Sequence, residues 1–246
     1  MAKVSAKDGL IIVGGYSLST QTYDYSVDVQ QDMIEVTGFT EGWKNYVGGL
    51  GVGSMTLGMY WNSDAASSNF YSTVAALKGM TSKCVTIIPD GYVLGNPAFS
   101  INAQQSNFNP AGVLSDALKL PSIKFQTKNG DGGPQSGWAL QHGAITNTLT
   151  GTQYDDPTGA AVTAACGGFL HVWSATATDT YVIKIQHSSN GSTWVDLVTF
   201  TLNGTAKNSE QVTVASGTVN RYRRVLATRT GAAGDTLGLT VVFYHL

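Results

Sequence analysis

The amino-acid sequence predicts a mainly β fold, in which a β-sandwich or curled barrel with one short α-helix precedes a second, smaller β-sandwich. Glycine is abundant, at 29 of 246 residues, and charged residues make up only 12% of the chain. Together with many Thr, Ser and Val residues, this balance is typical of short strands joined by tight turns. A chain of this length can form one large or two modest domains, each with its own buried core.

Two early runs are expected to be strands. Residues 10–13 are uniformly apolar, and residues 23–29 alternate Tyr or Val with Asp or Ser. Such alternation puts apolar side chains on one face of a strand and polar side chains on the other. Residues 38–53 are rich in glycine and are expected to form a long, bent connection around Trp43, whereas residues 54–61 alternate again and predict another strand.

Between Asp64 and Gly79 the pattern changes from strand to helix. Phe70, Val74 and Leu77 are spaced i, i+4 and i+7, which places them on one side of a helix. Asp64, Ser67 or Ser68 can cap the first turn, and Gly79 stands where a left-handed residue ends a helix. We expect one helix of about three turns here.

Strand-like runs recur at residues 83–88, 98–105 and 120–127, while residues 107–118 are expected to form a loop or a single helical turn. The next stretch, NGDGGPQSG at residues 129–137, combines turn-forming residues with almost no apolar content. This composition is typical of a junction between domains.

The junction, placed within residues 129–145, divides the chain into a domain at residues 1–135 and a second at residues 136–246. Asn190-Gly191 in the second domain favours a tight hairpin turn between two strands. Spacing and alternation there predict an immunoglobulin-like or jelly-roll-like β-sandwich. The strand-like runs are residues 169–174, 181–187, 192–202, 211–215, 222–228 and 237–244.

Two stretches of the sequence resemble the major tail proteins, or tail tube proteins, of long-tailed bacteriophages. The first is TGFTEGWKNYVGGLGVGSMTLGMYWNSDAASSNFYSTVAALKG, residues 37–79. A Thr-Gly-Phe entry, a tryptophan, a glycine-rich turn, an alternating strand and a capped helix follow one another in it. The second comprises IQHSSNGSTWVDLVTF and GTVNRYRRV, which resemble the C-terminal β-sandwich attached to some of these proteins.

The resemblance implies a structural virion protein and no enzymatic activity or cofactor. Copies of the chain would form hexameric rings that stack into the tail tube and contact other tail proteins. Genomic DNA would pass through the lumen without sequence-specific binding. The second domain would lie on the outer surface. The protein would be made in the host bacterial cytoplasm and would reside in the virion tail.

By the same resemblance, the connection at residues 41–54 would meet a neighbouring subunit or ring. A phosphate-binding role for its glycines is disfavoured, because the Lys-Ser/Thr of a P-loop is missing and a strand is expected to follow. Residues 1–143 hold ten acidic residues against eight lysines, a slight excess that would suit a lumen passing DNA. The candidate inter-subunit residues are Trp43, Gly48, Gly49, Gly51 and Gly53.

The sequence leaves a second class of function open, a virion decoration or receptor-binding protein that recognises host surface carbohydrate. Trp173, Trp194 and Tyr222 could stack on sugars in the second domain. All four arginines fall between Arg221 and Arg229, where a basic strand could meet anionic glycans or a neighbouring subunit. Core tryptophans and a solvated or interface strand are the structural alternatives.

Motifs for catalysis and metal binding are missing from the sequence. The four histidines lack HxxxH or HExxH spacing, and no G-x-S-x-G motif is present. The adjacent Asp155 and Asp156 are expected to point apart, which makes a glycan hydrolase the least favoured alternative. Cys84 and Cys166 lack CxxC spacing and are expected to be buried thiols.

Charge and hydropathy exclude two further classes of partner. The net charge of -2 provides no large basic field for gripping nucleic acid. The apolar run at residues 10–13 is far shorter than a signal-peptide core or a membrane span, so we expect no membrane segment.

Overall fold

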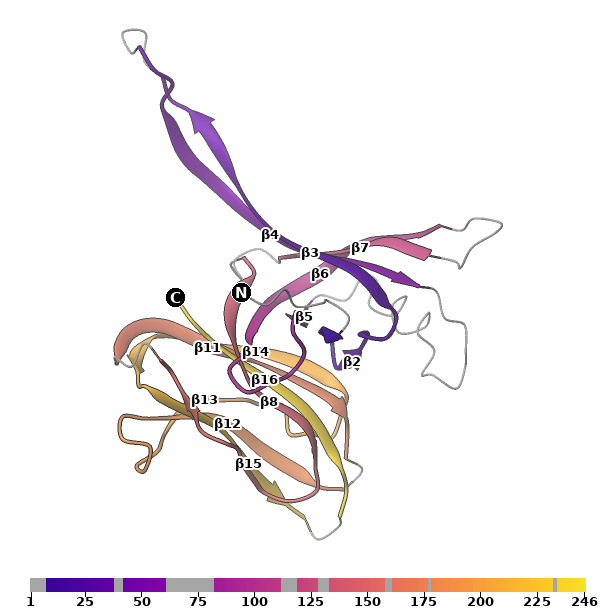
Figure 1. Cartoon of the computed structure of the whole chain (residues 1–246), viewed down its shortest axis with the longest axis vertical. Helices are drawn as coiled ribbons and strands as arrows, with labels where there is room; N and C mark the ends of the chain where they lie inside the picture. The colour runs from indigo at the N-terminus through magenta and orange to yellow at the C-terminus, as the bar shows by residue number, and fades with distance from the viewer. Residues whose placement is uncertain are drawn as a thin grey trace. The chain divides into compact units, whose positions relative to one another are not determined.

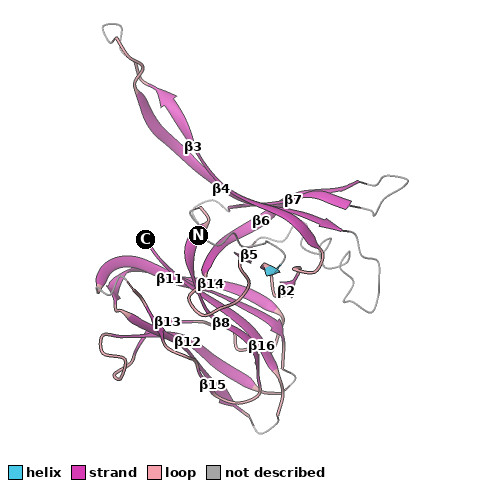
Figure 2. Cartoon of the chain, viewed as in Figure 1, coloured by secondary structure: helices cyan, strands magenta, loops and turns pink. Residues whose placement is uncertain are grey.

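The structure is a computed structural model that describes residues 8–37, 42–60, 82–111, 119–127, 133–157, 161–176, 178–231 and 234–246. These residues form strands β1 to β16, arranged in an eleven-stranded sheet and a five-stranded sheet (Figures 1 and 2). The prediction of a mainly β fold is thereby confirmed. The helix expected between Asp64 and Gly79 lies outside the described residues.

The chain forms two compact units. The sandwich unit comprises Met1–Thr22, Lys83–Ser100 and Gln135–Leu246, and the arm unit comprises Tyr23–Ser82 and Ile101–Pro134. This division differs from a sequential boundary near residue 135, because residues 1–22 and 83–100 join the second half of the chain. Long-range pairing is the cause: β1 pairs with β5, and the first residues of β6 pair with β8.

The sandwich unit contains parts of both sheets. Its strands in the large sheet follow the order β14-β11-β16-β8-β6-β5-β1-β2, and the small sheet has the order β10-β15-β12-β13, with β9 beside β15. The strands are β1 Leu10–Val13, β2 Tyr16–Ser17, β5 Lys83–Ile88, β6 Pro97–Ala111, β8 Gln135–Ile145, β9 Leu149–Thr150, β10 Tyr154–Asp155, β11 Val162–Ser174, β12 Thr180–Ser188, β13 Val195–Thr199, β14 Asn208–Val219, β15 Tyr222–Thr230 and β16 Leu237–His245.

Strand β16 is buried on both faces, because each face of the large sheet has its own apolar cluster. Leu239 and Val241 belong to the cluster shared with the small sheet, which includes Ile183 and Ile185 of β12. Val242 and Tyr244, on the opposite face, belong to a second cluster. Cys84 lies in that second cluster and Cys166 in the first, which confirms that both thiols are buried.

The strands of the arm unit follow the order β3-β4-β7-β6. β3 is Thr22–Glu35, β4 is Tyr46–Tyr60, β7 is Lys119–Thr127, and β6 continues into this unit as far as Ala111. One face of the sheet is apolar: Met55, Leu57 and Met59 of β4 are fully buried, and Phe125 and Ile123 lie opposite Met55 and Leu57. Alternation in residues 54–61 predicted this packed face correctly.

Most other strand predictions are also confirmed, although several elements differ in extent or type. The run at residues 192–202 shortens to β13, and residues 107–111 continue β6, so the loop or helical turn expected there is wrong for this part. Residues 135–145, within the expected junction, form β8. The hairpin at Asn190-Gly191 is confirmed as the β12–β13 hairpin, although residues 189–194 connect the strands and the expected tight turn is therefore wrong. Asn190 Oδ1 accepts hydrogen bonds from the Ser192 and Thr193 backbone nitrogens.

Candidate assembly surface

The outer half of the β3–β4 hairpin, residues 28–37 and 42–53, is called the arm. Here β3 and β4 pair with each other, whereas β4 pairs with β7 only from Ser54 to Tyr60. Figure 1 shows the two strands continuing side by side beyond that pairing. A ribbon of two strands without a third is marginally stable at best in water. The arm therefore gains little stability from its own pairing.

The arm exposes large apolar side chains on both faces. Met33 and Ile34 follow one another and so point to opposite faces, yet they are 60% and 55% exposed. Tyr46 and Val47 repeat this arrangement on β4, and Trp43 is 87% exposed. Contiguous exposed apolar surface is uncommon on monomeric proteins and marks interaction sites. Further exposed apolar residues of the arm are Val29, Val36 and Val52.

Hydrogen bonds define the end of the arm. The Val36 backbone nitrogen donates to the Asn45 carbonyl oxygen at 2.8 Å. The Asn45 nitrogen donates to Thr37 Oγ1 at 3.0 Å, and Thr37 Oγ1 donates to Glu35 Oε1 at 3.1 Å. Lys44 Nζ lies 3.0 Å from the other Glu35 oxygen. An exposed ion pair adds little stability, and these linked bonds join the described residues on the two sides of the turn.

All five candidate inter-subunit residues lie in the arm. Trp43 occupies the turn between β3 and β4, as a connection would require. Gly48, Gly49, Gly51 and Gly53 lie in strand β4, so the expected bent loop is wrong. Glycine in this strand permits close packing. A Cβ atom on Gly48 would lie 2.5 Å from the side-chain nitrogen of its cross-strand neighbour, a glutamine of β3. The inter-subunit role of the five residues stays a prediction.

Sequence reasoning did not identify Val29, Met33 and Ile34 as site residues. The signal is the adjacent pair Met33-Ile34, which breaks the apolar–polar alternation of residues 23–29. From this point onward, both faces of the strand carry apolar side chains. An edge strand with that pattern exposes apolar side chains on both faces when no partner covers it.

Strand β3 also carries a row of carboxylates. Asp24, Asp28 and Asp32 are four residues apart, so the two-residue period of a strand places them on one face, and all three are exposed. On the other face Tyr23 lies with its ring centroid 4.9 Å from that of Tyr60. The acidic excess counted in the first part of the sequence thus includes a row along one strand.

Asp155 and Asp156 have separate partners. Asp155 is exposed, and Arg221 Nη2 donates a 2.8 Å hydrogen bond to it, which lowers the pKa of this carboxyl. Asp156 is buried and accepts a 2.8 Å hydrogen bond from Arg223 Nη2. Two carboxylates that cleave a glycosidic bond have to flank one shared space. Here each is held by its own arginine.

The histidines make structural contacts. His171 Nε2 lies 2.8 Å from Thr86 Oγ1, and the His245 ring stacks on Trp138 with a centroid distance of 5.0 Å. Within the described ranges, no group of three or more His, Cys, Asp or Glu side chains is placed to hold a metal ion. No helix in the described part of the chain is long and apolar enough to cross a membrane.

The three aromatic residues considered for sugar stacking are each covered in part by the chain itself. Arg224 Cζ lies 4.1 Å from the ring centroid of Trp194, and Arg221 Cζ lies 5.1 Å from that of Tyr222. The indole nitrogen of Trp173 is buried. These contacts favour the structural interpretation of the three rings.

No known protein family and no curated protein matches the sequence. Among solved structures, a chain of the native gene transfer agent (GTA) virion is 12% identical, with a TM-score of 0.39; the match covers 52% of this chain and 95% of that one. The SPP1 Dit (gp 19.1) protein, a hub adsorption apparatus protein of phages that infect Gram-positive bacteria, is 10% identical, with a TM-score of 0.40; coverage is 96% and 99%.

A chain of infectious bursal disease virus, Gx strain, is 10% identical, with a TM-score of 0.21, and the match covers 99% of this chain and 69% of that one. At TM-scores and identities this low, the three similarities decide neither the fold nor the function of this chain.

Proposed function

We propose that this chain is a structural protein of a phage tail, whose copies associate through the arm into rings that stack into a tube. The observation that carries the proposal is the arm itself, a two-stranded ribbon with exposed apolar side chains on both faces. Burial of apolar surface contributes about 25 cal/mol per Å². A neighbouring copy is the partner that would cover the exposed apolar side chains of the arm in every subunit.

The strand order of the arm unit supports association by sheet extension. β3 is the outermost strand and is 14 residues long. Among the described strands it pairs only with β4. Long unpaired edges invite pairing with another chain. When one surface of each copy binds a different surface of the next copy, the contact repeats along the series. The copies form a closed ring if the rotation from one copy to the next permits closure. Six copies per ring is the number that the sequence resemblance implies.

The acidic row on β3 suits a tube that conducts DNA. Asp24, Asp28 and Asp32 would repeat around a ring, and like charge repels phosphate groups, so DNA would pass without being gripped. The sandwich unit, with its separate core, would decorate the outer surface and contact other tail proteins. The protein would then reside in the virion tail after synthesis in the bacterial cytoplasm.

Electron microscopy of the purified chain tests the proposal. Rings or hollow tubes are expected, with the copy number read from end-on views. The variant Val29→Ser, Met33→Ser, Ile34→Ser should stay monomeric, because it removes three exposed apolar side chains of the arm. A matched control is Val93→Ser, Val182→Ser, Val195→Ser, which removes three comparably exposed side chains from the sandwich unit. The control should assemble like the original chain.

Two results would overturn the proposal. One is a chain that remains monomeric or trimeric at every concentration and binds host surface glycans, as a receptor-binding protein would. The other is assembly of the arm variant and the control to the same extent, which would exclude the arm as the contact.

A further inference from the structure

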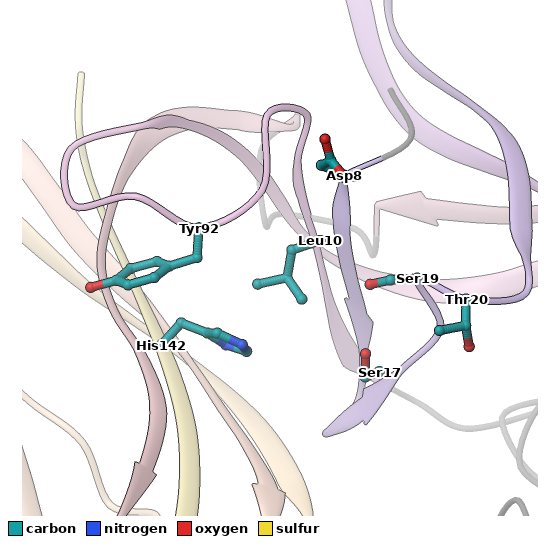
Figure 3. A pocket seen from close by; sticks show the side chains of 8 residues that line it. Asp8, Leu10, Ser17, Ser19, Thr20, Tyr92 and His142 are labelled. Atoms are coloured by element: carbon teal, nitrogen blue, oxygen red, sulfur yellow. The ribbon is translucent and has the colours of Figure 1, made fainter. Parts of the chain in front are cut away.

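A pocket of about 500 Å³ opens in the sandwich unit, beside the β1–β2 hairpin (Figure 3). This volume lies within the range of about 300–1,000 Å³ that is typical of small-molecule sites. All of the described lining residues belong to one compact unit. They are Asp8, Gly9, Leu10, Ser17, Ser19, Thr20, Tyr92 and His142.

The pocket has two walls of different chemistry. Figure 3 shows the rings of Tyr92 and His142 on one side, with Asp8, Ser19 and Thr20 on the other. Leu10 lies between them. The first wall therefore offers aromatic surface, and the second offers a carboxylate and hydroxyl groups. A hydroxyl both donates and accepts hydrogen bonds, whereas an ionised carboxylate only accepts.

The aromatic wall is fixed by contacts outside the pocket. The centroids of Tyr92 and His142 are 5.6 Å apart, and the His142 ring also lies 5.6 Å from that of Trp173. His142 Nδ1 is 2.8 Å from Thr240 Oγ1, which holds the orientation of the imidazole. Because these rings are positioned before any ligand arrives, binding would cost little ordering of side chains.

The polar wall is likewise held in place. The Ile11 backbone nitrogen donates to Ser19 Oγ at 2.9 Å, which anchors the segment after β2 against β1. Ser17, Thr20 and Asp8 are exposed toward solvent. Their polar groups are therefore available to a ligand. The β1–β2 pairing fixes the backbone that carries Ser17, whereas Asp8 and Thr20 flank these two strands.

Charge restricts the class of ligand. None of the described lining residues is Lys or Arg, and Asp8 is the only acid among them. Burial lowers the pKa of His142, so its imidazole is neutral at neutral pH. Among these described residues, a phosphate or carboxylate ligand would meet a negative group and no positive one. The lining suits a neutral molecule rich in hydroxyl groups.

We propose that this pocket binds a neutral saccharide unit. A sugar ring presents C–H groups that pack on an aromatic ring, and hydroxyl groups at its rim that can donate to Asp8 and exchange hydrogen bonds with Ser17 and Thr20. Hydrogen bonds to a charged acceptor are the stronger ones. Asp8 would therefore contribute most to affinity, and Tyr92 would select for a flat apolar ring face. The site is independent of the arm.

Saturation-transfer NMR on the full chain tests the proposal, with glucose, galactose and N-acetylglucosamine as probes. At least one of these sugars should give a signal. Glucose 6-phosphate and glucuronic acid should bind more weakly than the matching neutral sugar. Asp8→Asn should raise the Kd about tenfold or more, because it removes a charged acceptor. The matched control Asp28→Asn removes an exposed carboxylate from the arm unit and should leave the Kd unchanged.

Three outcomes would overturn the proposal. The first is that none of the neutral sugars binds at millimolar concentration. The second is that choline binds more tightly than the sugars do, which would make the site a cation site. The third is equal binding by the original chain, Asp8→Asn and Ser17→Ala, which would place any sugar elsewhere. Ser17 and Asp8 are exposed, so neither substitution threatens folding. Tube formation is scored separately by microscopy, so either proposal can fail without the other.

Discussion

Arg223 Nη2 donates a 2.8 Å hydrogen bond to the carboxylate of Asp156 inside the sandwich unit, where the two side chains are only 1% and 5% exposed. The guanidinium carbon lies 4.8 Å from the ring centroid of Phe243 and 5.4 Å from that of Trp138. Arg223 Nε and Nη1 are buried without a hydrogen-bond partner in the described part of the chain. The pair and the rings together hold the segment after β10 against β15.

Substitution of one member of this pair should be far more costly than substitution of both. Arg223→Met leaves a buried carboxylate without its arginine and should lower the free energy of unfolding by about 3–5 kcal/mol. The double variant Arg223→Met, Asp156→Leu should recover most of that loss. Urea denaturation measures both. Arg221→Met, which removes the exposed pair with Asp155, is the control and should leave the midpoint unchanged. Equal losses in the single and double variants would contradict this account.

His171 should make stability depend on pH. Its Nε2 atom bonds to Thr86, which lies 2.8 Å from Ser100 Oγ, and full burial lowers the pKa of His171 to about 3. The unfolded chain takes up a proton below about pH 6.5, whereas the folded chain does not until about pH 3. Stability is therefore complete above pH 6.5 and is lost as the pH falls through this window, by about 2 kcal/mol at pH 5.

Denaturation at about pH 7.5 and about pH 5 checks this prediction. In His171→Leu the difference between the two free energies of unfolding should shrink by about the same 2 kcal/mol. Burial also lowers the pKa of His142, His187 and His245, so some loss in acid should persist in the variant. An unchanged pH dependence would show that His171 becomes protonated in the folded chain.

Gly137 should not tolerate a side chain. It lies on β8 opposite Tyr244 of β16, and a Cβ atom there would be 2.2 Å from the Phe243 carbonyl oxygen. Because the obstructing atom is backbone of a central strand, relief requires breaking the strand pairing. Gly137→Ala should cost about 2–3 kcal/mol in thermal or chemical denaturation. Gly42→Ala, where no atom lies within 4 Å of the added Cβ, should change stability little. Similar midpoints for the two variants would refute the argument.

Removal of the arm should separate folding from assembly. Gln30 and Gly51 face each other, with 3.8 Å between the Gln30 carbonyl oxygen and a Cβ built on Gly51. An Asn-Gly turn can therefore replace residues 31–50. The shortened chain should keep the cooperative unfolding of the original, since the described side chains in the deleted segment are exposed, but should sediment as a monomer. Tubes formed by the shortened chain would show that the contacts lie elsewhere.

Alternation located most strands, because it records which face each residue buries. Met55, Leu57 and Met59 predicted their own strand correctly. The run at residues 10–13 predicted β1 by being uniformly apolar, without alternation. The alternation rule failed at Gly48 to Gly53, because glycine has no side chain with which to show a pattern. Strand and turn are then indistinguishable from local sequence.

Local sequence could not predict which segments of the chain form each of the two units, for a different reason. Leu10 pairs with Ile88, and Trp138 pairs with Phe243, across separations that no short window spans. The pocket has the same origin, since Asp8, Tyr92 and His142 come from three distant segments. Motifs reveal a site only when its residues are close in sequence, whereas these are brought together by strand pairing.

During synthesis, the sandwich unit can be completed only after strand β16 has been made. It pairs with both β11 and β8, yet it is made after both of them. The facing edges of β8 and β11 have to stay open until residues 237–245 leave the ribosome. The described strands of the arm unit are all complete by Thr127. A copy interrupted before Leu237 would thus carry the arm without a closed sandwich. A subunit is complete only when β16 has paired with β8 and β11.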